Sequence, residues 1–441
     1  MGTGLSTAKR GFPSASEALS AGPISWAAFL VGLAVLPVWS PLMLVSWLVA
    51  SIALAAGGLW PLRPGPAGRW LIATALVLLV LTAFSVRPGD SLLGLFNYLP
   101  FFLFFGLAVH LVDRAERLTQ LLTVLLWGGL VTGLAGLFEW VTGANWQWEP
   151  LSGLVLLTVG SRQEAGILDR VTAFFAWPTS TAAYLLLVLP LAAAIALGGL
   201  PRQRWLGWAV LAVGGVTLLG TASRNAWMIA LLVVGALLLV ARRWRLVTAL
   251  TAGAGTVLLA GLGPVSWPPI RWLREIVPAS LWQKVSESIT SGTASFTSLT
   301  NRLDAWQIAL RMTGERPLTG WGLQTFPFVE KTYFGHDAAQ LLHAHNLYLT
   351  YTAETGIPAA LLLVGFYLWT LLRGVRQAVS LRGVSRWQQA GLLAALVAYL
   401  LFGFSDVPFY DARINALFWI ELALIWRMPS LALQETIKEH S

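Results

Sequence analysis

Apolar runs long enough to cross a membrane recur from one end of this chain to the other. A membrane-spanning helix needs about 20 mostly apolar residues, because the hydrocarbon core of a bilayer is about 30 Å thick. Only 11% of the 441 residues are charged, against about 25% in an ordinary soluble domain. The sequence therefore predicts an all-α, polytopic membrane protein.

About twelve transmembrane helices are expected, with one large loop. The apolar runs cover residues 24–40, 42–60, 70–86, 92–112, 118–141, 174–199, 204–221, 225–241, 246–264, 346–372, 388–405 and 412–428. Arginine and lysine clusters fall on alternate connections between these runs, for example at Arg242, Arg243 and Arg245. The positive-inside rule makes that side cytoplasmic and puts both termini on it.

This topology divides the chain into five parts. They are a cytoplasmic tail at 1–23, helices one to nine at 24–264, a large outside loop at 265–345, helices ten to twelve at 346–428, and a cytoplasmic tail at 429–441. Within the large loop, residues 301–312 have helical spacing with Asn301 as the N-cap, and the Ser/Thr-rich stretch 286–300 before them is expected to be flexible.

Several function classes are excluded by what the sequence lacks. There is no cysteine, which excludes disulfides, iron–sulfur clusters and thiolate zinc sites. There is no phosphate-binding glycine loop, no His-Glu-x-x-His and no Asp-x-Asp pair. The net charge of +9 is scattered between apolar runs, where it sets orientation rather than binding nucleic acid. We expect no metal, no cofactor and no nucleic-acid partner.

The stretch from His343 to Pro358 lies where the large loop meets the tenth apolar run. Polar groups at such a border are costly unless something uses or satisfies them. Glu354 inside the run is either part of an ion path or a hydrogen-bonded support, and Gly356 with Pro358 predicts a kink. The other polar residues of interest here are His343, His345 and Asn346.

Two arginines fall on the same side of the membrane as His345. Arg224 lies at the turn before the eighth run, and Arg302 lies in the large loop. Guanidinium groups bind phosphate in a bidentate way, and histidine takes a proton near neutral pH, so the set suits an anionic, lipid-linked substrate. Structural alternatives remain: Arg224 could snorkel, Arg302 could pair with Asp304 or Glu315, and His343 could simply be solvated.

Four short segments resemble the O-antigen ligase/polymerase superfamily, and its O-antigen ligase branch in particular. They are His343-Ala-His-Asn-Leu-Tyr-Leu with Gly356 after ten residues that follow His345, Ser223-Arg224-Asn225-Ala226-Trp227, the stretch from Asn301-Arg302-Leu303 to Arg316-Pro-Leu-Thr-Gly-Trp-Gly322, and Phe404-Ser405-Asp406 with the later Phe418-Trp419.

The resemblance implies a metal-independent, inverting glycosyltransferase of GT-C-like fold in the bacterial inner membrane, with its loop and site in the periplasm. The donor would be an undecaprenyl-pyrophosphate-linked glycan, and the acceptor lipid A-core or a similar sugar. Arg224 and Arg302 would bind the pyrophosphate, and His345 would deprotonate the acceptor hydroxyl. The supporting residues would be His343, Asn346, Glu354 and Gly356.

Two alternatives stay open at the level of sequence. One is a polymerase that joins lipid-linked repeat units, although the second outside segment at 142–172 carries only Arg162 and Arg170 and lacks an arginine-rich motif. The other is a transporter of the inorganic-carbon type, in which Glu354 and His345 would form a proton relay.

Overall fold

The computed structural model describes residues 15–59, 65–148, 157–160, 170–287, 290, 294–335 and 342–440. Almost all of this described chain is helical. Its α-helices are α1 (Ala15–Val35), α2 (Ser40–Ala56), α3 (Pro66–Thr82), α4 (Pro88–Gly94), α5 (Leu99–Leu111), α6 (Ala115–Thr142), α7 (Pro178–Gly198), α8 (Pro201–Gly220), α9 (Arg224–Val240), α10 (Trp244–Leu262), α11 (Pro268–Ile276), α12 (Ala279–Glu287), α13 (Ala294–Glu315), α14 (Phe326–Tyr333), α15 (Leu347–Ala378), α16 (Gly383–Phe402) and α17 (Ala412–His440). Two short 3-10 helices, η1 (Leu95–Asn97) and η2 (Pro408–Tyr410), and one antiparallel pair of strands, β1 (Trp146–Trp148) and β2 (Leu157–Val159), complete the set.

Each predicted apolar run overlaps a helix of the structure, and the fourth run overlaps the succession α4, η1 and α5. By length and composition, five helical stretches among the described residues can cross a membrane, and four shorter helices are also apolar. The five are Pro88–Leu111, Ala115–Thr142, Pro178–Gly198, Trp244–Leu262 and Leu347–Ala378. The chain is a membrane protein; the count of twelve crossings stays a prediction.

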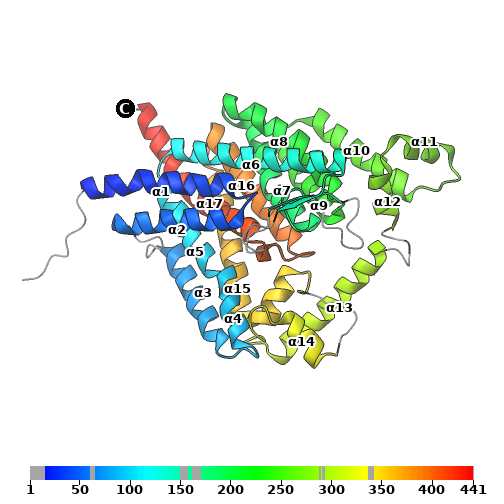
Figure 1. Ribbon diagram of the computed structural model, residues 1–441. Helices are drawn as coiled ribbons and strands as arrows, with labels where there is room; N and C mark the ends of the chain where they lie inside the picture. The colour runs from blue at the N-terminus through cyan, green and yellow to red at the C-terminus, as the bar shows by residue number, and fades with distance from the viewer. Residues whose placement is uncertain are drawn as a thin grey trace, which may run out of the picture.

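Helix α7 forms the centre of the bundle (Figure 1). In its most apolar stretch of 18 residues, 94% of the residues are buried. Helices α6, α8, α9 and α16 pack around it. A helix that is apolar on every side needs such surroundings, because it has no face to offer to water. Helix α17 packs against α5 and α16, so the first part of this last helix lies inside the bundle.

The described residues of the predicted large loop fold into the four helices α11 to α14. Helix α13 packs on α15, at the edge of the molecule where α4 and α14 also lie (Figure 1). The expected helix at 301–312 is confirmed, but it begins earlier, at Ala294, so Asn301 lies inside it and is not its N-cap. Serine and threonine are only mildly poor helix formers, which allows the helix to include part of the stretch expected to be flexible.

Helix α15 is broken at Gly356, where the backbone has φ 75° and ψ 165°. The kink predicted from Gly356 and Pro358 is therefore confirmed. The carbonyls that the break frees are satisfied by the turn at 317–322: Trp321 N donates to Ala353 O at 3.0 Å, and Gly322 N donates to Glu354 O at 2.9 Å. The break thus joins the large loop to the helix that begins next to His345.

Candidate functional site

The site begins at the N-terminus of α15, where Asn346 is the N-cap. Its Oδ1 accepts hydrogen bonds from two backbone amides of the first turn, at 3.0 and 3.1 Å. Its Nδ2 donates to Phe404 O at 3.2 Å, and Leu347 N donates to Gly403 O at 2.7 Å. These bonds attach the start of α15 to the turn that follows α16, two segments far apart in the sequence.

This attachment brings Asp406 next to the two histidines. The Nδ1 atom of His345 lies 3.7 Å from Oδ1 of Asp406. One donor atom each from His343, His345 and Asp406 lie within 4.8 Å of one another. Asp406 is buried, and its Oδ1 accepts a hydrogen bond from Val407 N at 2.8 Å, which fixes the carboxylate toward the imidazoles.

His343 supports the backbone of His345. His345 has a φ of 48°, an unusual value for a residue with a side chain, and its backbone N–H donates to Nδ1 of His343 at 3.1 Å. The His343 ring also stacks on Tyr410, with ring centroids 5.6 Å apart. Burial lowers the pKa of the His343 imidazole to about 4, against the opposing effect of Asp406. His343 is therefore a neutral support rather than a solvated side chain.

Asp406 carries a charge in this site. Burial by itself raises the pKa of its carboxyl group, but the neighbouring imidazoles of His345 and His343 and the guanidinium of Arg302 together hold that pKa well below its ordinary value. An ionised carboxylate beside Nδ1 of His345 favours a proton on that nitrogen, which leaves Nε2 as the basic atom.

Three arginines converge beside this cluster. Burial lowers the pKa of Arg170, and the charges of Arg302 and Arg224 lower it further, so the three guanidinium groups act on one another. Arg224 begins α9 and donates from Nη1 to Lys284 O at 3.3 Å, whereas Arg302 belongs to α13. The repulsion among these like charges is relieved when an anion binds beside them, which suits phosphate recognition.

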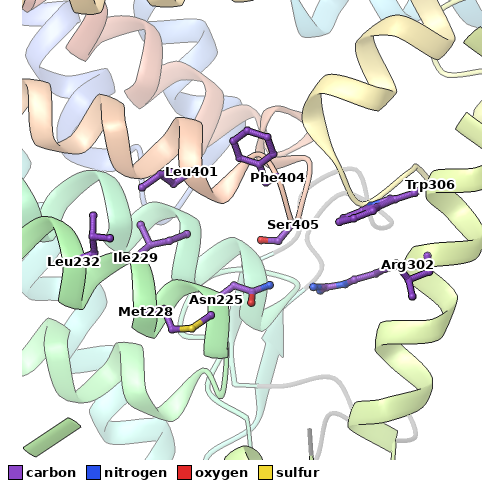
Figure 2. Close-up of a pocket in the computed structure, with 10 residues that line it drawn as sticks. Asn225, Met228, Ile229, Leu232, Arg302, Trp306, Leu401, Phe404 and Ser405 are labelled. Atoms are coloured by element: carbon purple, nitrogen blue, oxygen red, sulfur yellow. The ribbon is translucent and has the colours of Figure 1, made fainter. Parts of the chain in front are cut away.

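The structural alternative for Arg302 is not observed. Among the described residues, no ion pair joins Arg302 to Asp304 or Glu315. Its side chain extends from α13 toward Asn225 and Ser405 (Figure 2). Arg302 therefore faces the site rather than its own helix.

Arg170 and the residues just after it are held by hydrogen bonds to two other segments. Its Nε donates to Thr221 O at 2.9 Å, in the turn just before Arg224. The carboxylate of Glu139 accepts from Thr172 N at 2.9 Å and from Ala173 N at 2.7 Å. These contacts fix the segment after the β-strands to α6 and to the turn between α8 and α9.

A groove opens beside Arg302, with a volume of about 480 Å³. We name it the α9–α16 groove; its walls come from α9, from α13 and from the end of α16 with the turn that follows it (Figure 2). It is lined by Asn225, Met228, Ile229, Leu232, Arg302, Leu303, Trp306, Leu401, Phe404 and Ser405.

Glu354 supports the site from two turns further along α15. Its buried carboxylate accepts hydrogen bonds from Tyr410 Oη at 3.2 and 3.3 Å, and it also has backbone hydrogen bonds with Gln324 and Phe326. Tyr410 in turn stacks on His343. Of the two roles expected for Glu354, these contacts favour the hydrogen-bonded support.

His343, His345 and Asp406 also have the donor types of a metal site, two imidazoles and a carboxylate. The positive charge of Arg302 lowers the pKa of both His343 and Asp406. The same charge would repel a metal cation bound by these side chains. The absence of a metal stays a prediction from the sequence.

Most residues expected from the sequence come together here: His343, His345, Asn346, Arg224 and Arg302 around one end of α9 and α15, with Glu354 and Gly356 behind them. Asp406, Arg170 and Tyr410 were not expected to take part in the site. Asp406 followed the eleventh apolar run on the same predicted side as His345, which was a usable signal. For Arg170 and Tyr410 the predicted side of the membrane was the signal that the sequence offered.

The family comparison covers the middle of the chain. Residues 209–364 match the family described as O-Antigen ligase. The matched segment contains all the site residues expected from the sequence, whereas Arg170 and Asp406 lie outside it. No curated protein matches the chain significantly. The match supports an O-antigen ligase or polymerase type of function in general, with a lipid-linked glycan donor and an acceptor.

Proposed function

We propose that this chain, which carries an O-antigen ligase domain at residues 209–364, transfers a glycan from undecaprenyl pyrophosphate to lipid A-core or a similar sugar acceptor. The observation that supports this most is the pairing of His345 with Asp406 beside Arg302. A base and an anion-binding group are then adjacent, as displacement of a diphosphate requires.

In the proposed reaction, an acceptor hydroxyl attacks the anomeric carbon of the donor sugar. The hydroxyl proton passes to Nε2 of His345, and the bond from the anomeric carbon to the pyrophosphate breaks with its electron pair on the leaving group. Asp406 stabilises the imidazolium that forms, since it lies 3.7 Å from Nδ1. Attack opposite to the leaving group inverts the anomeric centre, and no metal or cofactor takes part.

The arginines serve the leaving group in this proposal. Pyrophosphate gains charge as the glycosidic bond breaks, so guanidinium groups fixed beforehand stabilise the transition state more than the ground state. Arg224 and Arg302 bind it directly. Arg170 adds a third positive charge, held by its bond to Thr221 O.

The proposed location is the inner membrane, with the site on the periplasmic side and both termini in the cytoplasm. Arg224 begins α9, whereas Arg242, Arg243 and Arg245 follow its other end. Helix α16 has Asp406 beyond its C-terminus and Arg382 before its N-terminus. At 1.5 Å per residue these helices are about 25 and 30 Å long, which supports a site and basic clusters on opposite faces of a bilayer, as the positive-inside rule expects.

Purified protein, incubated with the lipid-linked donor and candidate acceptors, tests the proposal. His345→Ala, Arg224→Ala and Arg302→Ala are expected to abolish transfer while the protein stays folded in the membrane. Arg311→Ala is the matched control, because Arg311 is an exposed arginine on the same helix as Arg302. Full product from the His345→Ala enzyme would remove the proposed base, and loss of activity with a chelator would contradict metal independence.

A deletion strain separates the ligase from the polymerase. Loss of all attached glycan from the cell surface indicates a ligase, whereas loss of the repeat ladder with one unit still attached indicates a polymerase. Ion or bicarbonate flux in proteoliposomes without glycan transfer would instead favour the transporter.

A further inference from the structure

Helix α10 turns most of its surface outward. It is one of the five helical stretches that can cross a membrane, and only 11% of the residues in its most apolar stretch of 18 are buried. So large an apolar surface on a membrane protein is covered by lipid. The end of α10, at Leu262, therefore lies at a surface of the bilayer.

Helix α11 is fixed at this end of α10. Its Ile270 is fully buried, and the guanidinium of Arg274 donates to Ala260 O at 2.7 Å and to Gly263 O at 3.3 Å. Positions 270 and 274 share one face of the helix because they are four residues apart. Helix α11 therefore lies beside the last turn of α10, at the edge of the molecule (Figure 1).

The opposite face of α11 is apolar and exposed. Trp272 and Ile276 lie about 200° around the helix from Ile270 and Arg274. They are 62% and 60% exposed. The same exposed apolar surface continues through the connection to α10, with Leu258, Leu259, Leu262, Val265 and Trp267. Tryptophan at the end of a span and a short helix with one apolar face are typical of the membrane–water interface.

A positive charge accompanies this face. Arg271 is exposed and adjoins Trp272. Glu275 is four residues further along, but among the described residues no ion pair joins it to Arg271. A guanidinium group next to an apolar face at this level matches the phosphate of a phospholipid headgroup.

We propose that α11 lies in the headgroup layer of the bilayer, on the side of the site, with Trp272 and Ile276 between the lipids and Arg271 on a lipid phosphate. The contact with lipid does not depend on the proposed function. Its effect on catalysis, through Arg224, rests on that function.

Helix α12 connects this lipid contact to Arg224. The end of α10, α11 and α12 share one apolar cluster, and the guanidinium of Arg274 lies over the ring of Trp282 on α12 at 4.4 Å. Helix α12 in turn supplies the carbonyl of Lys284, which accepts from Arg224 Nη1 at 3.3 Å. The depth of α11 in the headgroup layer thus sets the position of the group that holds Arg224.

A depth measurement tests the lipid contact without any turnover. The chain has no cysteine, so Ile276→Cys and Glu275→Cys each give a single site for a fluorescent label. In phospholipid nanodiscs, lipids with a nitroxide at headgroup level should quench the label at 276 about twice as strongly as the one at 275, which lies on the polar side. Equal quenching at the two positions, or none at 276, would overturn the inference.

The lipid composition tests the role of Arg271. Phosphatidylglycerol in place of phosphatidylcholine should increase the quenching at 276, because an anionic headgroup layer attracts a guanidinium group. Arg271→Gln should remove this increase, whereas Arg243→Gln, at the other end of α10, should keep it. An increase that persists in Arg271→Gln would contradict the phosphate contact.

Transfer kinetics test the effect on Arg224. In nanodiscs, Trp272→Ser should raise KM for the lipid-linked donor about tenfold, since a displaced Arg224 binds the diphosphate less well, and Trp272→Phe should restore it. In detergent, which has no headgroup layer, Trp272→Ser and the wild type should have equal KM values. The same rise in detergent would mean a purely structural role for Trp272. An inactive wild type would refute the proposed function instead, and the labelling would still decide the lipid contact.

Discussion

Asp406→Asn tests how His345 is made an effective base. The asparagine keeps the shape of the side chain and can still accept the hydrogen bond from Val407 N, so the turn after α16 should persist. It loses the charge that faces Nδ1 of His345 at 3.7 Å. That charge matters most when the imidazole has taken a proton, which in the proposed reaction happens in the transition state.

The size of the effect follows from this distance. Two unit charges 4 Å apart attract by about 4 kcal/mol at an effective dielectric constant of about 20. The side chains of His345 and Asp406 are 30% and 11% exposed, and Arg302 also neutralises part of the carboxylate charge. About half of the attraction, roughly 2 kcal/mol, should remain, and its loss lowers kcat about 30-fold, since about 1.4 kcal/mol is a factor of ten.

Steady-state kinetics with the lipid-linked donor measure this change. A lower kcat with an unchanged KM for the donor is expected, because the interaction is made only in the transition state. Asp90→Asn is a suitable control, since Asp90 pairs with Arg87 at the exposed start of α4. Wild-type kcat in the Asp406→Asn enzyme, or a loss expressed only as a higher KM, would refute this reasoning.

Two further predictions concern stability. The pKa of His343 is about 4 in the folded protein and about 6.5 in an unfolded chain, so the unfolded state binds the proton first as pH falls. The stability due to a neutral His343 is complete above about pH 6.5 and falls by about 2 kcal/mol by pH 5; unfolding in detergent should show this loss in the wild type but not in His343→Asn, and equal pH dependence of the two would contradict it. Tyr410→Phe removes a hydrogen bond to the carboxylate of Glu354 but keeps the ring on His343, and should cost about 1.5–3 kcal/mol with kcat nearly unchanged. Thermal unfolding with a parallel activity assay checks this, and a large loss of kcat without loss of stability would mean that the hydroxyl takes part in the reaction.

The helices were predictable from the sequence because a bilayer demands long apolar runs, and every predicted run overlaps helical structure. The break at Gly356 was predictable for a similar local reason, since glycine and proline act on their own stretch of backbone. The N-cap expected at Asn301 was wrong because helix α13 already begins at Ala294. Local propensity alone did not set that boundary.

The partners of His345 could not be read from the sequence, because they depend on contacts between distant segments. Asp406 reaches the imidazole only because Asn346 is hydrogen-bonded to Phe404 O, 58 residues away in the chain. Arg170 is in place because Glu139 on α6 and Thr221 in the turn between α8 and α9 hold its segment. Such contacts leave no periodicity or spacing that a sequence pattern would reveal.

The first part of α15 is fastened at both ends. Its N-terminus is hydrogen-bonded to the turn at 403–404, and its far end, at Gly356, is sealed by the turn at 317–322. The number of helical residues between these two anchors therefore fixes the distance between them. One inserted or deleted residue would rotate everything beyond it by about 100° and shift it by about 1.5 Å, and both anchors could not then be satisfied together. The fold thus requires the interval of ten residues between His345 and Gly356. Homologous chains should differ in the length of their loops much more often than in the length of this interval.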